Sequence, residues 1–268
     1  MAAFRNGRII RALRGLARAA GRRSLRAVVT AERRIGLIAC LWLVGLGLVV
    51  VTRLGLMRVA PSWPTLFAHS LLILSPALGI LLAMRLFPRA GLVALPKVVL
   101  ARIGRWRRLD PVAAQSHPSF GAGGLMAGLA IGLLMNVVLR TGEFLMAAPA
   151  IAAEGPPWAR VFFFSFAADC ILFNLLYAAA FVMAVRHVPW FPRVLLLIWT
   201  MEVTSQLLIA QLLGSQALPG SVARALGGLL TGNVQKTLIS MALWLPYLLL
   251  SERVNVTYRR RVRHEAER

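Results

Sequence analysis

Two carboxyl groups lie deep inside long apolar stretches, where a charged side chain needs a specific reason to be present. Asp169 is nine residues into the apolar run 160–185, and Glu202 is nine residues into the run 193–213. At 1.5 Å per residue, each carboxyl lies about 13 Å from the start of its run. Ionisable residues at mid-depth in a membrane are costly, and they commonly mark proton relays, ion pathways or substrate sites.

Further polar side chains occur at helical spacing around these two acids. One follows Glu202 by a single turn, another follows Asp169 by five residues, and two more are one turn apart in the run 122–142. The seam could relay protons or cations or bind a small polar substrate. It could equally join helices, with a carboxyl group hydrogen bonded to an amide or paired with an arginine, and one acid per helix favours this structural role. The residues of this predicted site are Asp169, Glu202, Gln206, Asn174, Arg140 and Asn136.

The composition predicts an all-α, polytopic transmembrane bundle. Of the 268 residues, 59% are hydrophobic and the mean hydropathy is +0.72, whereas a soluble domain is about 45–50% apolar. Runs of about 20 apolar residues can cross a hydrocarbon core about 30 Å thick. About six such spans are expected, at 35–57, 65–86, 122–142, 160–185, 193–213 and 235–251.

The distribution of basic residues predicts the orientation of these spans. The chain has a net charge of +22, and 25 of its 31 lysines and arginines fall in the segments 1–34, 85–108, 186–193 and 253–268. Because cytoplasmic segments are enriched in lysine and arginine, both termini are expected in the cytoplasm. The basic residues flank apolar runs instead of lining a soluble face, so the expected partner is the lipid bilayer and not nucleic acid.

The N-terminal segment has the pattern of an amphipathic basic helix. Between residues 4 and 23, apolar side chains share one helical face and five arginines occupy the other, with no acid before Glu32. This pattern favours a helix on the membrane surface that binds anionic lipid headgroups. The alternatives are a mitochondrial presequence or a basic arm that contacts ribosomal RNA or DNA. The expected organisation is a basic arm 1–34, a helix pair 35–86, a basic linker 87–120, a four-helix domain 121–258 and a basic tail 259–268.

Two further patterns bear on packing and chemistry. Gly124, Gly128 and Gly132 share one helix face, which predicts a close approach of a neighbouring helix. The sequence contains no HExxH, GxSxG or P-loop lysine motif, and its four histidines lie far apart. We therefore expect no enzymatic activity, no metal and no cofactor.

The last apolar run and the residues after it resemble a family signature. The stretch "ALWLPYLLLSERVNVTY" is similar to the closing motif of the bacterial inner-membrane family catalogued as domain of unknown function 2569. "FPRVLLLIW" from Phe191 and "GGLMAGLAIGL" from Gly123 are similar to two of its helix openings, with Leu125 in place of the usual Trp. The resemblance covers about residues 120–260 and implies a bacterial inner-membrane location but no reaction. The matching residues of the closing motif are Trp244, Pro246, Tyr247, Ser251, Arg253, Val254 and Thr257.

Two functions remain as hypotheses at this point. The first is a non-enzymatic membrane scaffold that binds a protein partner, which the absence of catalytic motifs supports. The second is a small transporter or proton-coupled carrier, which requires that Asp169, Glu202 and Arg140 face one cavity. In either case, Arg253 and Thr257 are expected to tie the tail to the loop 186–193, and Tyr258 to rest among the lipid headgroups.

Overall fold

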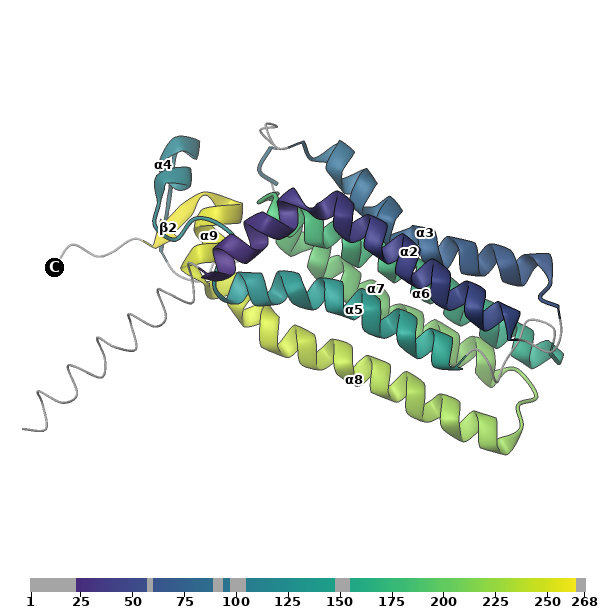
Figure 1. Ribbon diagram of the computed structural model, residues 1–268. Coiled ribbons are helices and arrows are strands. Elements are labelled where there is room, and N and C mark those ends of the chain that lie inside the picture. Colours follow the sequence, from purple (N-terminus) through teal and green to yellow (C-terminus); the bar gives the residue numbers. More distant parts are fainter. Residues whose placement is uncertain (1–22, 57–59, 89–93, 97–104, 148–154, 264–268) are drawn as a thin grey trace, which may run out of the picture.

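The computed structural model describes residues 23–56, 60–88, 94–96, 105–147 and 155–263. These residues form a bundle of long helices, in which each long helix is antiparallel to the next along the chain, with a small module at one end (Figure 1). Five helices are long and apolar enough to cross a membrane, and a sixth, α8, passes the same test together with α9, from which it is bent by 71°. The predicted helical bundle with five to six candidate spans is therefore confirmed. The long helices are α2 (Ile35–Gly55), α3 (Trp63–Leu86), α5 (Leu125–Ala147), α6 (Pro157–Val185), α7 (Phe191–Gly214) and α8 (Gly220–Leu250).

Helix α6 is the centre of the bundle. It packs against α3, α5 and α7, and 67% of its most apolar stretch is buried, compared with 11% for α2. Helix α8 packs on α7, and α2 packs on the outside of α3, where the Trp42 indole donates to the Ile73 carbonyl over 3.0 Å. A large set of apolar side chains therefore faces outward, as a bundle surrounded by lipid requires.

Among the described glycines, Gly79 of α3 lies closest to a neighbouring helix. A Cβ atom at this position would lie 2.2 Å from the Leu175 carbonyl oxygen of α6. Because that neighbour is backbone, the two helices would have to separate to admit even a methyl group. Gly79→Ala is therefore expected to lower the free energy of unfolding by about 1–3 kcal/mol. Gly45→Ala in α2 is the matched control, since a Cβ there meets nothing within 4 Å; equal stability of the two variants in a detergent unfolding titration would contradict this contact.

The predicted glycine contact face on α5 is wrong for two of its three members. Among the described residues, a Cβ added at Gly124 or Gly132 meets nothing within 4 Å, and one at Gly128 comes no closer than 3.9 Å, to the Trp244 ring. Gly124 precedes the helix with φ +64. Gly132 instead lines a cavity, so its missing side chain leaves space for something other than a helix.

The end module, consisting of β1 (Trp106–Arg108), α4 (Pro111–Ser116), α9 (Glu252–Arg259) and β2 (Arg261–Arg263), closes one end of the bundle. The two three-residue strands pair antiparallel, so part of the linker 87–120 contacts part of the tail 259–268. The Gly124 amide donates to the Ser24 hydroxyl over 2.8 Å. Both ends of the described chain thus meet at the same end of the bundle, as an even number of spans demands.

Two sequence-based predictions about the tail are wrong. Arg253 and Thr257 do not bind the loop 186–193: the Arg253 guanidinium donates to the Phe120 and Gly121 carbonyls, and the Thr257 hydroxyl accepts from the Gly121 amide over 3.0 Å. Tyr258 does not lie among headgroups but is fully buried, and its hydroxyl donates to the Ala184 carbonyl over 2.7 Å. The 71° turn between α8 and α9 is the cause, since it folds the tail back onto the bundle.

Candidate functional site

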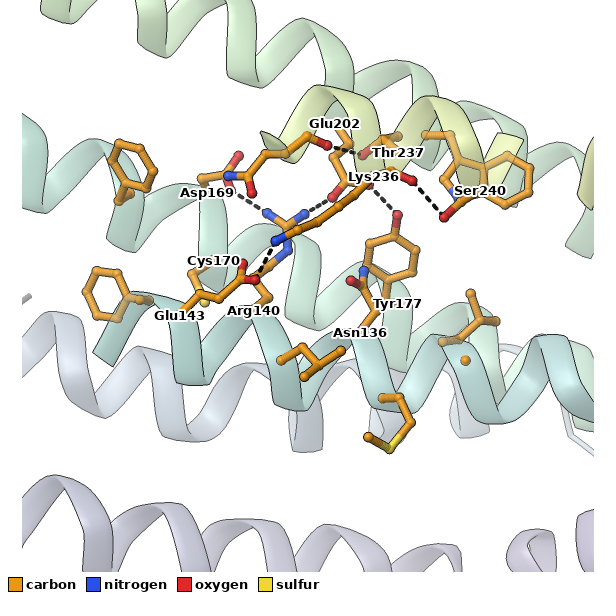
Figure 2. A pocket seen from close by; sticks show the side chains of 18 of the residues that line it. Asn136, Arg140, Glu143, Asp169, Cys170, Tyr177, Glu202, Lys236, Thr237 and Ser240 are labelled. Carbon is orange, nitrogen blue, oxygen red and sulfur yellow. Dashed lines mark hydrogen bonds and ion pairs between the residues drawn. The ribbon is translucent and has the colours of Figure 1, made fainter. Parts of the chain in front are cut away.

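Arg140 of α5 holds two carboxylates from two other helices. Its Nη1 lies 2.5 Å from Oδ2 of Asp169 on α6, and its Nη2 forms an ion pair with Oε1 of Glu202 on α7. Figure 2 shows the guanidinium between the two acids. The side chains of Arg140, Asp169 and Glu202 are 13%, 5% and 6% exposed. The three residues therefore meet as predicted, and they do so in a largely buried place.

The two carboxylates accept further hydrogen bonds that fix their orientation. Oδ1 of Asp169 accepts from the Ser205 hydroxyl over 2.6 Å and from the Gln206 amide over 3.1 Å. Oε2 of Glu202 accepts from the Tyr177 hydroxyl. Charge-assisted hydrogen bonds of this kind are about twice as strong as neutral ones. These hydrogen bonds hold both carboxylates in a fixed orientation inside the bundle.

A cavity of about 380 Å³ lies against this triad. Its volume is within the range of about 300–1,000 Å³ that is typical of small-molecule sites. Apolar side chains from four helices form most of its wall, Trp199 and Trp244 among them. The wall on α5 extends from Leu129 to Ala147, about 27 Å at 1.5 Å per residue. The polar residues of the wall are Asn136, Arg140, Glu143, Asp169, Tyr177, Glu202, Asn233, Lys236, Thr237 and Ser240.

Part of the cavity wall between α5 and α8 is exposed. Lys236 of α8 and Glu143 of α5 both line the cavity, and their side chains are 63% and 40% exposed. Their Nζ and Oε1 atoms are 2.5 Å apart, so an ion pair joins the two helices here (Figure 2). In the described part of the chain, α8 packs on α7 and α5 packs on α6, with only sparse contact between α5 and α8. Separation of one exposed ion pair would therefore widen the access to Arg140.

Four of the six predicted site residues line this cavity: Asn136, Arg140, Asp169 and Glu202. Gln206 lies behind it, where it binds Asp169 and accepts a hydrogen bond from Asn233 of α8 over 3.2 Å. Asn174 is fully buried and donates to the Thr141 hydroxyl over 2.8 Å. Its position between α5 and α6 gives it a role in helix packing and not in the cavity.

Sequence reasoning missed the residues that α8 contributes. Lys236 lay at the edge of the predicted run 235–251, and Asn233 lay outside that run. Helix α8 begins at Gly220, so both residues belong to its middle. A lysine and an asparagine three residues apart, before an apolar run, were the available signal. Tyr177 and Ser205, the other missed donors, occur in apolar surroundings without any motif.

The triad carries an unbalanced charge. With all groups ionised, Asp169 and Glu202 contribute two negative charges and Arg140 one positive charge, whereas Lys236 and Glu143 cancel. A net negative charge in a low-dielectric site is costly, and one added proton or one cationic group would neutralise it. The described residues contain no group of three or more His, Cys, Asp or Glu positioned to hold a metal ion.

Comparisons with protein-family models, with curated proteins and with solved structures found no match for this chain. The resemblance to domain of unknown function 2569 therefore remains a prediction that rests on the motif residues alone. The structure divides those residues between two places. Trp244 lines the cavity from α8, whereas Arg253 and Thr257 bind the linker segment at Phe120 and Gly121.

Proposed function

We propose that this protein is a small carrier that couples the movement of a proton to that of a small polar or cationic solute across a membrane. The observation that supports the proposal is an Arg140–Asp169–Glu202 triad that lines an accessible cavity. Purely structural ion pairs are expected to be sealed between packed helices. Here the side chains of the triad border a cavity whose wall also includes the exposed Lys236–Glu143 pair.

The position of the triad suits such a function. Glu202 lies at the midpoint of α7, with 11 residues before it and 12 after it in the range Phe191–Gly214. Carriers commonly bind substrate and coupling ion near the middle of the bilayer, at the interface between helices that move relative to one another. When a cationic group or a proton adds to the triad, Arg140 can pair with one acid while the other is neutralised. This change of pairing would couple the binding of the solute to the binding or release of the proton.

Proton flux in liposomes tests the proposal. Purified protein is reconstituted with a trapped pH-sensitive dye, and a panel of small amines, inorganic monovalent cations and zwitterions is added outside. We expect at least one member of the panel to drive proton movement in the native protein. The double variant Asp169→Asn/Glu202→Gln is expected to slow it by about tenfold or more, because the groups that bind the proton are gone.

Glu252→Gln is the matched control for this experiment. Glu252 lies in α9, is exposed and does not line the cavity, so its replacement should leave the flux unchanged. Equal flux in the native protein and the double variant, or no flux in either, would reject a carrier function and favour a structural role for the triad.

The orientation and location of the protein follow as further parts of the proposal. The end module and residues 23–34 lie at the end of the bundle that collects the most basic residues, so we assign this end to the cytoplasm. A bacterial inner membrane is the location that the motif resemblance implies. The amphipathic arm lies mainly in residues 1–22, outside the described residues, and its binding to anionic headgroups remains a prediction.

A membrane scaffold is the second candidate function, and helix α2 favours it. Only 11% of its most apolar stretch is buried, and large side chains such as Leu41, Val44 and Leu48 are each at least 64% exposed. This face is free to pack on a partner helix as well as on lipid. Retrieval from gentle detergent followed by mass spectrometry tests it: a partner that is lost when Leu41 and Leu48 become alanine would support the scaffold.

A further inference from the structure

Three arginines lie close together where the bundle meets the end module. Arg193 is near the start of α7, Arg259 is the last residue of α9, and Arg261 begins β2. Burial, together with the charges of Arg261 and Arg193, lowers the pKa of Arg259 to about 10. Burial and Arg193 also lower the pKa of Arg261. The cations therefore repel one another at short range in a desolvated place.

Two of these arginines are more than nine-tenths buried. Arg259 is 8% exposed and Arg261 is 9% exposed. Both guanidinium groups share one acceptor, Oδ1 of Asn255, at 2.8 Å from Arg259 Nη1 and 2.7 Å from Arg261 Nε. Arg259 Nη1 also donates to the Leu249 carbonyl over 3.3 Å. The amide of Asn255 is neutral, so it orients the two cations without balancing their charge.

The remaining buried donors find no partner among the described residues. Arg259 Nε and Nη2 and Arg261 Nη2 have no hydrogen-bond partner within the described residues. No ion pair of the described chain includes either arginine; Glu252 and Glu32, two acids near this end of the bundle, pair with His117 and Arg186. Buried donors of a charged group that lack a partner are costly, and an anion between them would remove that cost.

We propose that Arg259 and Arg261, with Arg193 beside them, bind the phosphate group of an anionic ligand, which is either an anionic phospholipid headgroup or free phosphate. The planar fork of arginine donors matches the oxygens of a phosphate group and binds it with two parallel hydrogen bonds. The site lies where α7 begins and α8 ends, which is the headgroup depth of the proposed spans. The guanidinium carbon of Arg261 lies over the Trp106 ring, 5.0 Å from its centroid.

Ligand titration of the purified full-length protein tests this site. Short-chain phosphatidylglycerol, short-chain phosphatidylcholine and inorganic phosphate are added separately to protein in a neutral detergent, and thermal unfolding is followed with each. We expect phosphatidylglycerol or phosphate to raise the unfolding temperature of the native protein. Arg261→Gln is expected to bind that ligand about tenfold more weakly, because one charge-assisted donor set is lost. Arg261→Lys keeps the positive charge but loses the forked arrangement of donors. Its affinity for the ligand should lie between that of the native protein and that of Arg261→Gln.

Arg263→Gln is the matched control, since Arg263 belongs to the same strand but is exposed. Protection by phosphatidylglycerol alone supports the site with a lipid as its ligand, and equal protection by phosphate supports it with free phosphate. Equal weakening in Arg261→Gln and Arg263→Gln would show a general surface attraction and overturn the site. The absence of protection beyond that of phosphatidylcholine would overturn it as well. If Arg261→Gln does not fold, Arg261→Lys decides: unweakened binding there overturns the site.

Discussion

Arg140→Ala is expected to lower the free energy of unfolding by about 3–5 kcal/mol, the largest effect of any single replacement in the cavity. The reason is that Asp169 and Glu202, at 5% and 6% exposure, would remain in the bundle without their shared cation. Two carboxylates could then not both stay charged at that depth. Unfolding in mixed micelles of a mild detergent and sodium dodecyl sulfate measures the change.

A triple variant separates this charge effect from the loss of packing. Arg140→Met combined with Asp169→Asn and Glu202→Gln keeps side-chain volume and removes every charge of the triad. Replacement of a buried ion-pair network by neutral groups of similar size is often nearly neutral in stability. We expect the triple variant to unfold within about 1 kcal/mol of the native protein. A triple variant as unstable as Arg140→Ala would show that the side chain of Arg140 matters for packing and not for charge balance.

The charged residues of the site could be predicted from the sequence, because each one interrupts an apolar run and is visible locally. Asp169 and Glu202 each interrupt a run that is otherwise apolar, and the depth of each follows from counting residues at 1.5 Å apiece. Because the two spans are antiparallel neighbours, equal depth is enough to bring the acids together. The partner Arg140 is one turn from Asn136 in the preceding span, so its place on the same level was also predictable.

The side of the cavity formed by α8 could not be predicted in this way. The helix extends from Gly220 to Leu250, but glycine, threonine and asparagine lower the hydropathy of its first half. Hydropathy therefore assigned Lys236 to the end of a span. The tertiary structure places it in the middle of the helix, in the wall of the cavity. Polar residues that line a cavity lower the mean hydropathy of a helix, so that its composition resembles that of a loop.

The end module was missed for a related reason. Aromatic and basic residues after an apolar run usually lie at the membrane surface, and Tyr258 and Arg259 fit that rule by sequence. Only the turn of 71° after Leu250 and the pairing of β2 with β1 bury them. The pairing joins segments far apart in the chain, which no local pattern reports.

Tyr258→Ala is expected to cost about 3–5 kcal/mol of unfolding free energy, as truncation of a buried aromatic side chain usually does. The Tyr258 ring is fully buried, with its centroid 5.3 Å from that of Phe191 and 6.5 Å from that of His187. Its removal would leave a cavity between α9 and the loop that joins α6 to α7. A tyrosine among lipid headgroups would cost little to remove, so this measurement decides between the two placements.

Tyr258→Phe and Trp63→Ala complete the comparison. Phenylalanine keeps the ring and loses only the hydrogen bond to the Ala184 carbonyl, which also accepts from the His187 amide. Its expected cost is therefore about 0.5–1.5 kcal/mol. Trp63 is 74% exposed at the other end of the bundle, and its truncation should change stability by no more than about 0.5 kcal/mol. A Tyr258→Ala cost as small as that of Trp63→Ala would place the tail outside the bundle. It would also remove the buried environment that makes Arg259 and Arg261 a site for phosphate.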